Sequence, residues 1–242
     1  MKKILFSFLV ILLVATTQAQ PTKTIVHDVN AEARTIGSFI GIQVSGGITV
    51  YLSQGTTEAI AISTDEAKNN NKVKTEVKNG ILRIYMENGS WNTWSWKSKS
   101  VKAYVTVKTL ESIEASGACA VRLSDNLNAD NLKLDLSGAS SFKGNLTATT
   151  IKLDVSGASS ASISGKATKA IMEASGASSV KAYDFEVEDC KAEASGASSI
   201  GVGVSKNLQA EASGASSIRY KGDPATKNIA ATGASSVKKK DS

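Results

Sequence analysis

The second half of the chain repeats at intervals of about twenty residues, and this repeat limits the possible folds more than any other feature. A Ser-Gly-Ala triplet, once Thr-Gly-Ala, recurs with its glycine at Gly117, Gly138, Gly157, Gly176, Gly196, Gly214 and Gly233. Successive glycines are 21, 19, 19, 20, 18 and 19 residues apart. Such a period, with short β-type segments between the glycines, is typical of a solenoid whose coils stack only on their neighbours.

Apolar residues hold fixed positions relative to each of these glycines. Four residues before the glycine the chain has Ile113, Leu134, Leu153, Met172, Ala192, Ala210 and Ile229. Four residues after it the chain has Val121, Phe142, Ala161, Val180, Ile200, Ile218 and Val237. These positions alternate with polar ones, so each coil is expected to be strand, glycine corner, strand. Many inward residues are small, and we therefore predict a narrow parallel β-helix of seven Gly-Ala-Ser-Ser coils over residues 111–238.

Residues 37–110 alternate between apolar and polar positions without repeating. Ile40, Ile42 and Val44 share one predicted face. The dipeptide Asn79-Gly80 separates two alternating runs and predicts a hairpin, because both turn positions need positive φ. Helical periodicity is absent, so this part is predicted to be β-rich, and the fold class all-β. Residues 20–36 are polar with no clear period and are predicted to be a linker.

The first nineteen residues have the layout of a secretory signal peptide. Lys2 and Lys3 give a positive start, residues 4–15 are almost uninterruptedly apolar, and Thr17-Gln18-Ala19 fits a cleavage site. The apolar run is short of the roughly 20 residues that span a bilayer. We therefore predict an exported protein with residues 1–19 removed and no membrane span in the mature chain.

Composition excludes several classes of function. The chain has 28 Lys and Arg against 22 Asp and Glu, and loss of Lys2 and Lys3 would leave a net charge of +4. This mild excess does not indicate a nucleic-acid partner. His27 is the sole histidine, which removes most histidine-based metal sites and any scheme that needs two imidazoles. We expect neither a metal nor a cofactor.

Several segments resemble a known bacterial family. They are Phe39–Leu52, the Asn79–Ile84 hairpin, Val101–Val107 and Leu110–Ala118. They are similar to the family "putative auto-transporter adhesin, head GIN domain", over roughly residues 37 to 238. The resemblance implies an exported protein of Bacteroidetes type with a β-helix-like fold, located in the periplasm, the outer membrane or on the cell surface of a Gram-negative bacterium. It supplies no catalytic or binding residues.

Two rows of charged residues follow from the repeat. Three residues before the glycine the row is acidic: Glu114, Asp135, Asp154, Glu173, Glu193 and Glu211. Five residues after it the row contains Arg122, Lys143, Lys181, Arg219 and Lys238. Because coils stack about 4.8 Å apart, each row lines up along the solenoid. The acidic row could bind divalent cations and the basic row an anionic glycan, or both could be solvated faces, the carboxylates being relieved by Lys133, Lys152 and Lys191.

All three tryptophans lie within six residues, at Trp91, Trp94 and Trp96. Exposed tryptophans stack on sugar rings or insert at interfaces, which makes these three the candidate ligand-binding residues. The alternative is a plug that covers one end of the solenoid.

Catalytic equipment is poor. A serine nucleophile needs a base, and His27 is far in sequence from the serines of the Gly-Ala-Ser-Ser corners, which are better placed to hydrogen-bond between coils. The acidic cluster that interrupts the repeat comprises Asp184, Glu186, Glu188 and Asp189. It could serve a β-helical polysaccharide-active enzyme, or form a solvated bulge.

The leading interpretation is a non-catalytic, adhesin-like envelope or surface protein that binds a glycan or a cell-surface protein through the solenoid. A polysaccharide-active enzyme and an envelope-stress or assembly factor remain alternatives. Export favours disulfides, but Cys119 and Cys190 lie four coils apart, on the order of 19 Å along the axis. A disulfide needs Cα atoms within roughly 7 Å, so both thiols are predicted to be free and buried.

Overall fold

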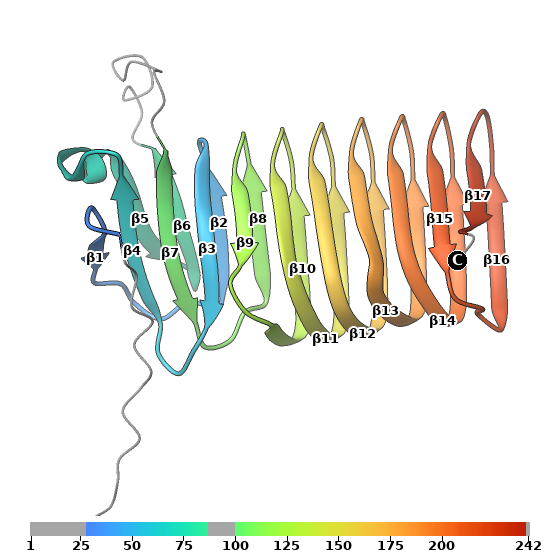
Figure 1. Ribbon diagram of the computed structural model, residues 1–242, viewed down its shortest axis with the longest axis horizontal. Coiled ribbons are helices and arrows are strands. Elements are labelled where there is room, and N and C mark those ends of the chain that lie inside the picture. Colours follow the sequence, from blue (N-terminus) through green and yellow to red (C-terminus); the bar gives the residue numbers. More distant parts are fainter. Residues whose placement is uncertain (1–27, 87–99, 241–242) are drawn as a thin grey trace, which may run out of the picture.

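The computed structural model describes residues 28–86 and 100–240, and most of them lie in β-strands (Figure 1). The coils stand side by side in one row, with the N-terminal strands at one end and β16 and β17 (Thr226–Ala231 and Ser236–Lys239) at the other. The predicted all-β class and the solenoid of about seven coils are confirmed. We refer to residues 28–110 as the head and to residues 111–240 as the coil array.

The coil array contains ten strands. They are β8 (Ser112–Ser116), β9 (Ala120–Leu123), β10 (Leu127–Leu136), β11 (Ser141–Val155), β12 (Ser160–Ala174), β13 (Ser179–Ala194), β14 (Ser199–Ala212), β15 (Ser217–Lys221), β16 and β17. In the middle of the array one long strand curves round most of each coil. Neighbouring strands pair in parallel with equivalent residues aligned, as in Leu134, Leu153 and Met172.

The interior of each coil follows the alternation of the sequence. In β11 the side chains of Phe142, Leu146, Ala148, Ile151 and Leu153 are buried, while Lys143, Asn145, Thr149 and Lys152 are exposed. Burial of these side chains removes apolar surface from water, and the parallel ladders satisfy the backbone of each interior coil on both sides.

A glycine turns each corner because two constraints coincide there. Gly157 has φ +72°, and a Cβ at this position would lie 2.5 Å from the carbonyl oxygen of Gly138 in the preceding coil. That carbonyl accepts a hydrogen bond of 2.7 Å from the amide of Ala158. The corners can therefore stack at the strand spacing only if no side chain separates them.

Most of the buried serines of the corners hydrogen-bond between coils through their hydroxyls, as the sequence predicted, but Ser140 Oγ has no partner within the described residues. Ser178 Oγ donates to the carbonyl oxygen of Val155 at 3.0 Å, and Ser198 Oγ donates to that of Ala174 at 2.9 Å. Ser216 Oγ repeats the contact to Ala194 at 2.9 Å. These bonds hold the corner residues of adjacent coils together.

In residues 28–86 and 100–110 the head contains seven strands and one short helix. They are β1 (Glu32–Arg34), β2 (Gly41–Ser45), β3 (Ile48–Gln54), β4 (Ala59–Thr64), the 3₁₀ helix η1 (Ala67–Lys72), β5 (Val73–Lys78), β6 (Ile81–Met86) and β7 (Val101–Val107). Strands β2 and β3 pair in parallel with β8 and β9 of the array. Strands β6 and β7 pair in parallel with β2 and β3 in turn, so the head adds two further coils to the stack.

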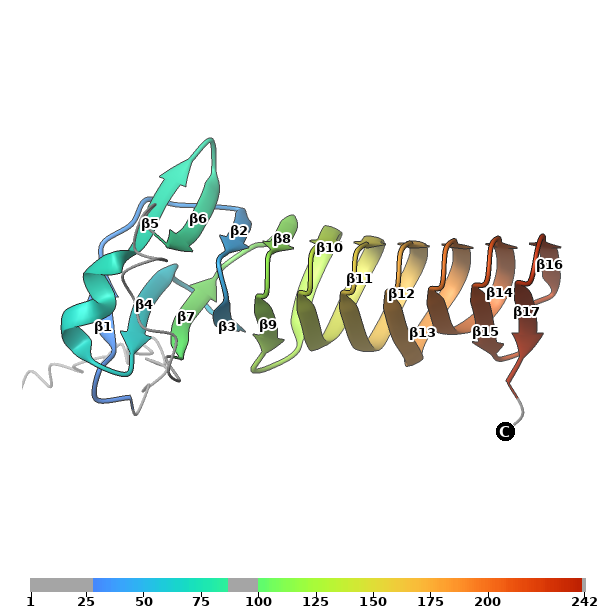
Figure 2. The same ribbon diagram turned by 90° about the horizontal axis from the view of Figure 1, so that it is seen from above.

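Antiparallel strands close the outer side of the head. Strand β4 pairs antiparallel with β7, and β1 pairs antiparallel with β4. The predicted hairpin is confirmed: β5 and β6 are antiparallel, with φ +53° at Asn79 and +74° at Gly80 (Figure 2). Ile40 does not share the buried face of Ile42 and Val44; it is 44% exposed because β2 begins only at Gly41.

Part of the segment predicted as a linker, residues 20–36, belongs to the folded head. Its described residues begin at Asp28 and include β1. Arg34 explains the attachment: its guanidinium donates to the carbonyl oxygens of Asn70 and Val73, at 2.6 and 2.5 Å. The sequence pattern missed this because the contacts are polar and distant in the chain.

Asp28 anchors the same segment to β4 and β7. Its carboxylate accepts hydrogen bonds from Tyr104 Oη and Ser63 Oγ, both at 2.9 Å, and from Lys102 Nζ at 3.2 Å. Burial alone would raise the pKa of Asp28, but the bonds from these three side chains lower it to about 2. Burial, the hydrogen bond to Asp28 and its charge raise the pKa of Tyr104 to about 12.

The two cysteines are buried, and the described structure leaves both of them free. Cys119 lies at the first corner of the array and Cys190 within β13. Burial raises the pKa of both thiols, that of Cys190 to about 12.

Candidate functional site

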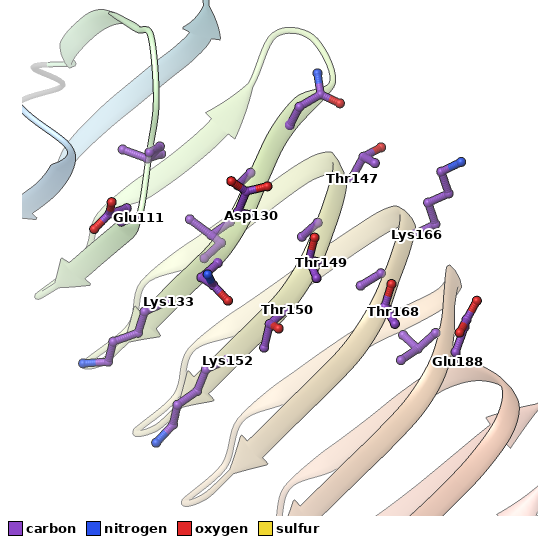
Figure 3. A pocket seen from close by; sticks show the side chains of 18 of the residues that line it. Glu111, Asp130, Lys133, Thr147, Thr149, Thr150, Lys152, Lys166, Thr168 and Glu188 are labelled. Atoms are coloured by element: carbon purple, nitrogen blue, oxygen red, sulfur yellow. The ribbon is translucent and has the colours of Figure 1, made fainter.

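A long groove crosses strands β10 to β14 on the side of the array where each strand curves (Figure 3). It has a volume of about 1210 Å³. The strand curves where alternation breaks: in β11, exposed Thr149 and half-buried Thr150 follow one another between buried Ala148 and Ile151. The groove therefore depends on the same break in successive coils.

Hydroxyl, amide and charged side chains line the groove in aligned rows. One row reads Asn128, Thr147, Lys166 and Glu186 across four coils. In Figure 3, Thr149, Thr150 and Thr168 lie along its middle, with Lys133 and Lys152 together on one side. Hydroxyl and amide groups both donate and accept hydrogen bonds, so this lining can bind the hydroxyls of a sugar chain or the backbone of a peptide.

Two contacts fix the ends of the groove. At the end near the head, the side-chain amide of Gln54 donates to the carbonyl oxygen of Asn128 at 3.0 Å and accepts from the Asn128 amide at 2.9 Å. At the other end, Lys206 Nζ lies 2.7 Å from Glu188 Oε2. The ion pair is exposed and adds little stability, but it neutralises that carboxylate.

Three carboxylates of the predicted acidic cluster have a partner of their own, and the fourth, that of Glu186, belongs to the row of Lys166 in the groove. Asp184 lies 3.5 Å from Lys221 Nζ, and Asp189 accepts a hydrogen bond from Asn207. The pairing of β13 with β14 slips between Ala182 and Glu186, which is the expected bulge. The residues lining the groove include neither His nor Cys, so its hydroxyls have no imidazole beside them.

The acidic residues do align along the array as predicted, and neighbouring lysines partly neutralise their charge. Its carboxylates align from Glu114 to Glu211 through successive strands. Lys133 lies 3.6 Å from Asp135, and Lys152 lies 3.7 Å from Glu173. Burial and the charges of Asp135 and Glu173 raise the pKa of Asp154. This pattern supports the interpretation as a solvated, self-neutralised face.

No group of three or more His, Cys, Asp or Glu side chains in residues 28–86 and 100–240 is arranged to hold a metal ion. Nor is any helix in those residues long and apolar enough to cross a membrane.

The basic row aligns on a different face from the acidic row. Arg122 pairs in register with Lys143, Lys143 with Ser162, and Ser162 with Lys181. The row continues through Gly201 and Arg219 to Lys238. At the head end it meets Tyr51, which stacks on Tyr104 with ring centroids 5.3 Å apart. The sequence alone did not place these tyrosines in the row, because that requires the register between β3, β7 and β9.

Trp91, Trp94 and Trp96, the predicted ligand-binding residues, lie outside the described residues. They follow β6 and precede β7 in the chain. Their role in binding therefore stays a prediction, as does the signal peptide of residues 1–19.

The profile of the family "Putative auto-transporter adhesin, head GIN domain" matches residues 38–224. The chain belongs to this family. The match covers the head from residue 38 onward, the groove and the array up to the loop before β16, which confirms the resemblance found in the sequence.

Solved structures of similar fold come from Bacteroides and Parabacteroides species. A protein described as a "putative adhesin" from Bacteroides fragilis has a TM-score of 0.78 and 20% identity, over 87% of this chain and 96% of the other. A "putative adhesin" from Parabacteroides distasonis has a TM-score of 0.67 and 20% identity, over 87% and 96%. A "putative lipid binding protein" from the same species has a TM-score of 0.58 and 19% identity, over 88% and 98%. At these identities the likeness establishes the shared fold. The comparison with curated proteins gave no match.

Proposed function

We propose that this protein is an exported, non-catalytic, adhesin-like protein of the cell envelope or cell surface that binds an extended glycan chain along the groove of the coil array. The observation that carries the proposal is the groove itself, which runs across strands β10 to β14 with hydroxyl, amide and charged groups in aligned rows. A polymer that lies along the groove contacts several coils at once, so weak contacts add along the chain.

A glycan fits this lining better than a flat protein partner does. Its Thr and Asn side chains suit the many hydroxyls of a sugar chain, and interfaces of this kind stay hydrated without losing affinity. The large apolar side chains in the lining, Leu110, Leu132 and Val187, are buried. The groove therefore exposes none of these large apolar side chains to a protein hot spot or a lipid tail.

We include Trp91, Trp94 and Trp96 as candidate sugar-stacking residues. If they contribute, replacing all three with Ala removes glycan binding and leaves the circular dichroism of the strands unchanged. Unchanged binding would remove them from the site, and loss of the folded spectrum would favour the plug interpretation.

The proposal is tested on a glycan array with the purified protein, together with fractionation of the cells that produce it. Thr149→Tyr combined with Thr168→Tyr fills the groove with two bulky residues that strands tolerate well. Ser160→Tyr is the matched control, because Ser160 is an exposed strand position outside the groove. We expect the double variant to lose at least tenfold in affinity and the control to bind like the wild type. Equal binding by both would contradict the groove as the site.

Fractionation tests the location, and a reducing-sugar assay tests the exclusion of catalysis. We expect the protein in the periplasm, in the outer membrane or on the surface, without its first nineteen residues. Cleavage of a polysaccharide that Asp184→Asn or Glu186→Gln abolishes would favour the enzyme alternative instead.

A further inference from the structure

The two rows of charge differ in their partners. In the acidic row, Asp135, Glu173 and Glu193 each form an ion pair with a lysine. The five cations of the basic row are all exposed, and within residues 28–86 and 100–240 none of them forms an ion pair. They are Arg122, Lys143, Lys181, Arg219 and Lys238.

The rows on either side do not neutralise these charges. The outward positions two residues before are Ala120, Ser141, Ser160, Ser179, Ser199, Ser217 and Ser236. The positions two residues after them are Ser124, Asn145, Ser164, Tyr183, Gly203, Lys221 and Lys240. Asp184, in the bulge beside this second row, is paired with Lys221 at 3.5 Å. The face is therefore positive, with hydroxyls along one side and Asp125 exposed beside Ser124 at its head end.

The three middle cations are evenly spaced, and Arg122 and Lys238 each lie one coil beyond them. Ser162 and Gly201 interrupt the row, so Lys143, Lys181 and Arg219 lie two coils apart. With coils about 4.8 Å apart, this places one cation every 10 Å or so in a straight line. That repeat is close to the length of one disaccharide unit of an extended polysaccharide.

Aromatic rings extend the row at its head end and fill one of its two interruptions, at Gly201. At the head end, Tyr51 and Tyr104 stack next to Arg122, and the hydrogen bond from Tyr104 to Asp28 holds the pair in place. Near the other end, the ring of Tyr183 lies against Gly201, where a Cβ would come within 2.4 Å of it, and Lys240 Nζ lies 4.3 Å from the ring centroid. A line of aromatic rings and cations can therefore contact a polysaccharide whose sugar rings and carboxylates also lie along a line, the rings stacking on sugars and the cations attracting carboxylates.

We propose that this face binds a linear anionic polysaccharide, one that carries about one carboxylate for each disaccharide, along the axis of the solenoid. The site is separate from the groove and does not depend on the function proposed for it. An anionic membrane is less well matched, since the rows of this face present Ser, Lys and Arg without the exposed apolar side chains that interfacial binding uses. Duplex DNA carries one charge per roughly 1.7 Å, far denser than this row.

The test measures affinity for hyaluronan, which has one carboxylate per disaccharide, as a function of salt. The variant is Lys143→Gln with Lys181→Gln and Arg219→Gln. The control is Lys78→Gln with Lys169→Gln and Lys191→Gln, which removes the same charge from exposed strand positions outside both the groove and the basic row. We expect the first variant to lose at least tenfold in affinity and most of the salt dependence, and the control to stay within twofold of the wild type.

A second measurement tests the spacing. Lys143 to Arg219 spans four coil steps, about 19 Å, so hyaluronan fragments should gain affinity from disaccharide to hexasaccharide as they reach a second and a third cation. Four results would overturn the proposal: no binding of hyaluronan, equal loss in both triple variants, no dependence on fragment length, or tighter binding to DNA or to phosphatidylglycerol vesicles than to hyaluronan. Circular dichroism melts confirm that both variants are folded.

Discussion

Equivalent interior positions of the head and of the last coils hold side chains of very different size. The row runs from Leu82 and Ile42 in the head through Leu153 in mid-array to Ala192 and Ala210, and reaches Ile229 in the last coil. Ile42, Leu153, Ala192 and Ala210 are all buried, so the coils of Ala192 and Ala210 bury less apolar surface at this position than the coil of Leu153. In the last coil, Ile229 is 43% exposed.

The polar contacts differ in the same direction. In the head, Asp28 and Arg34 join segments more than thirty residues apart through several hydrogen bonds each. In the array, contacts link each coil to the next through backbone ladders and corner serines. The head is therefore held by a few specific side chains, and the array by a backbone pattern that repeats.

The difference in size between Leu153 and Ala210, two buried residues of this row, leads to the prediction with the largest expected loss of stability. Leu153→Ala should lower the free energy of unfolding by about 2–5 kcal/mol, because it leaves a cavity in a coil packed on both sides. Ala210→Gly, in the same row, should cost only about 1 kcal/mol. Urea denaturation followed by circular dichroism measures both. Equal losses would show that the size of these side chains does not set the stability of the coils.

The next prediction compares the same turn in the two regions. Gly157→Ala should cost about 2–4 kcal/mol, since the new Cβ would meet the Gly138 carbonyl in addition to straining a positive φ. Gly47 in the head has φ +80°, and a methyl group added there would have nothing within 4 Å, so Gly47→Ala should cost only about 1–2 kcal/mol. Thermal melts of the two variants should therefore rank in this order; the reverse order would mean that corner stacking does not limit the array.

A third prediction concerns the polar anchor of the head. The folded pKa of Asp28, about 2, is below its ordinary value of 3.8, so its contribution is complete above pH 3.8 and is lost as pH falls toward 2. Asp28→Asn should destabilise the protein by about 1–3 kcal/mol at pH 7, because it weakens three hydrogen bonds to a charged acceptor. The difference in melting temperature between variant and wild type should shrink between pH 4 and pH 2. A difference independent of pH would mean that the charge of Asp28 is not what anchors the segment.

The last prediction concerns thiol reactivity and requires no change to the chain. Because burial raises the pKa of Cys119 and Cys190, neither thiol should react with Ellman's reagent at pH 8 in the native protein, and both should react in 6 M guanidinium chloride. Partial opening would expose Cys190 before Cys119 if the array opens from its C-terminal end. One thiol equivalent or none after unfolding without reductant would point to a disulfide and a different coil register.

The coil array could be predicted from the sequence because its order in space is its order in the chain. The two coils of the head were not, since β2 and β3 lie between β6–β7 and β8–β9, and no glycine period marks them. The groove was also missed. It depends on how strands curve at pairs such as Thr149 and Thr150, which periodicity alone does not reveal.

Both charge rows could be predicted from the sequence, but the difference in their ion-pair partners could not. Lys133 and Lys152 stand two residues before carboxylates on the same face, and spacing correctly predicts that they relieve that row. That the basic row lacks such partners became clear only from the register of Ser, Asn and Tyr positions around it. The tyrosine pair at its end joins strands that are far apart in sequence.

Because each coil aligns strictly on the next, the length of the molecule is set by the number of its coils. Because every row keeps its register, a duplication or deletion of one whole coil of about nineteen residues would change the length by about 4.8 Å and leave the neighbouring coils unaltered. Each such event would add or remove one position in the groove and in both charge rows together. A lineage could therefore match the protein to ligands of different length by unequal recombination within the repeat, without any change to the residues that make a single contact.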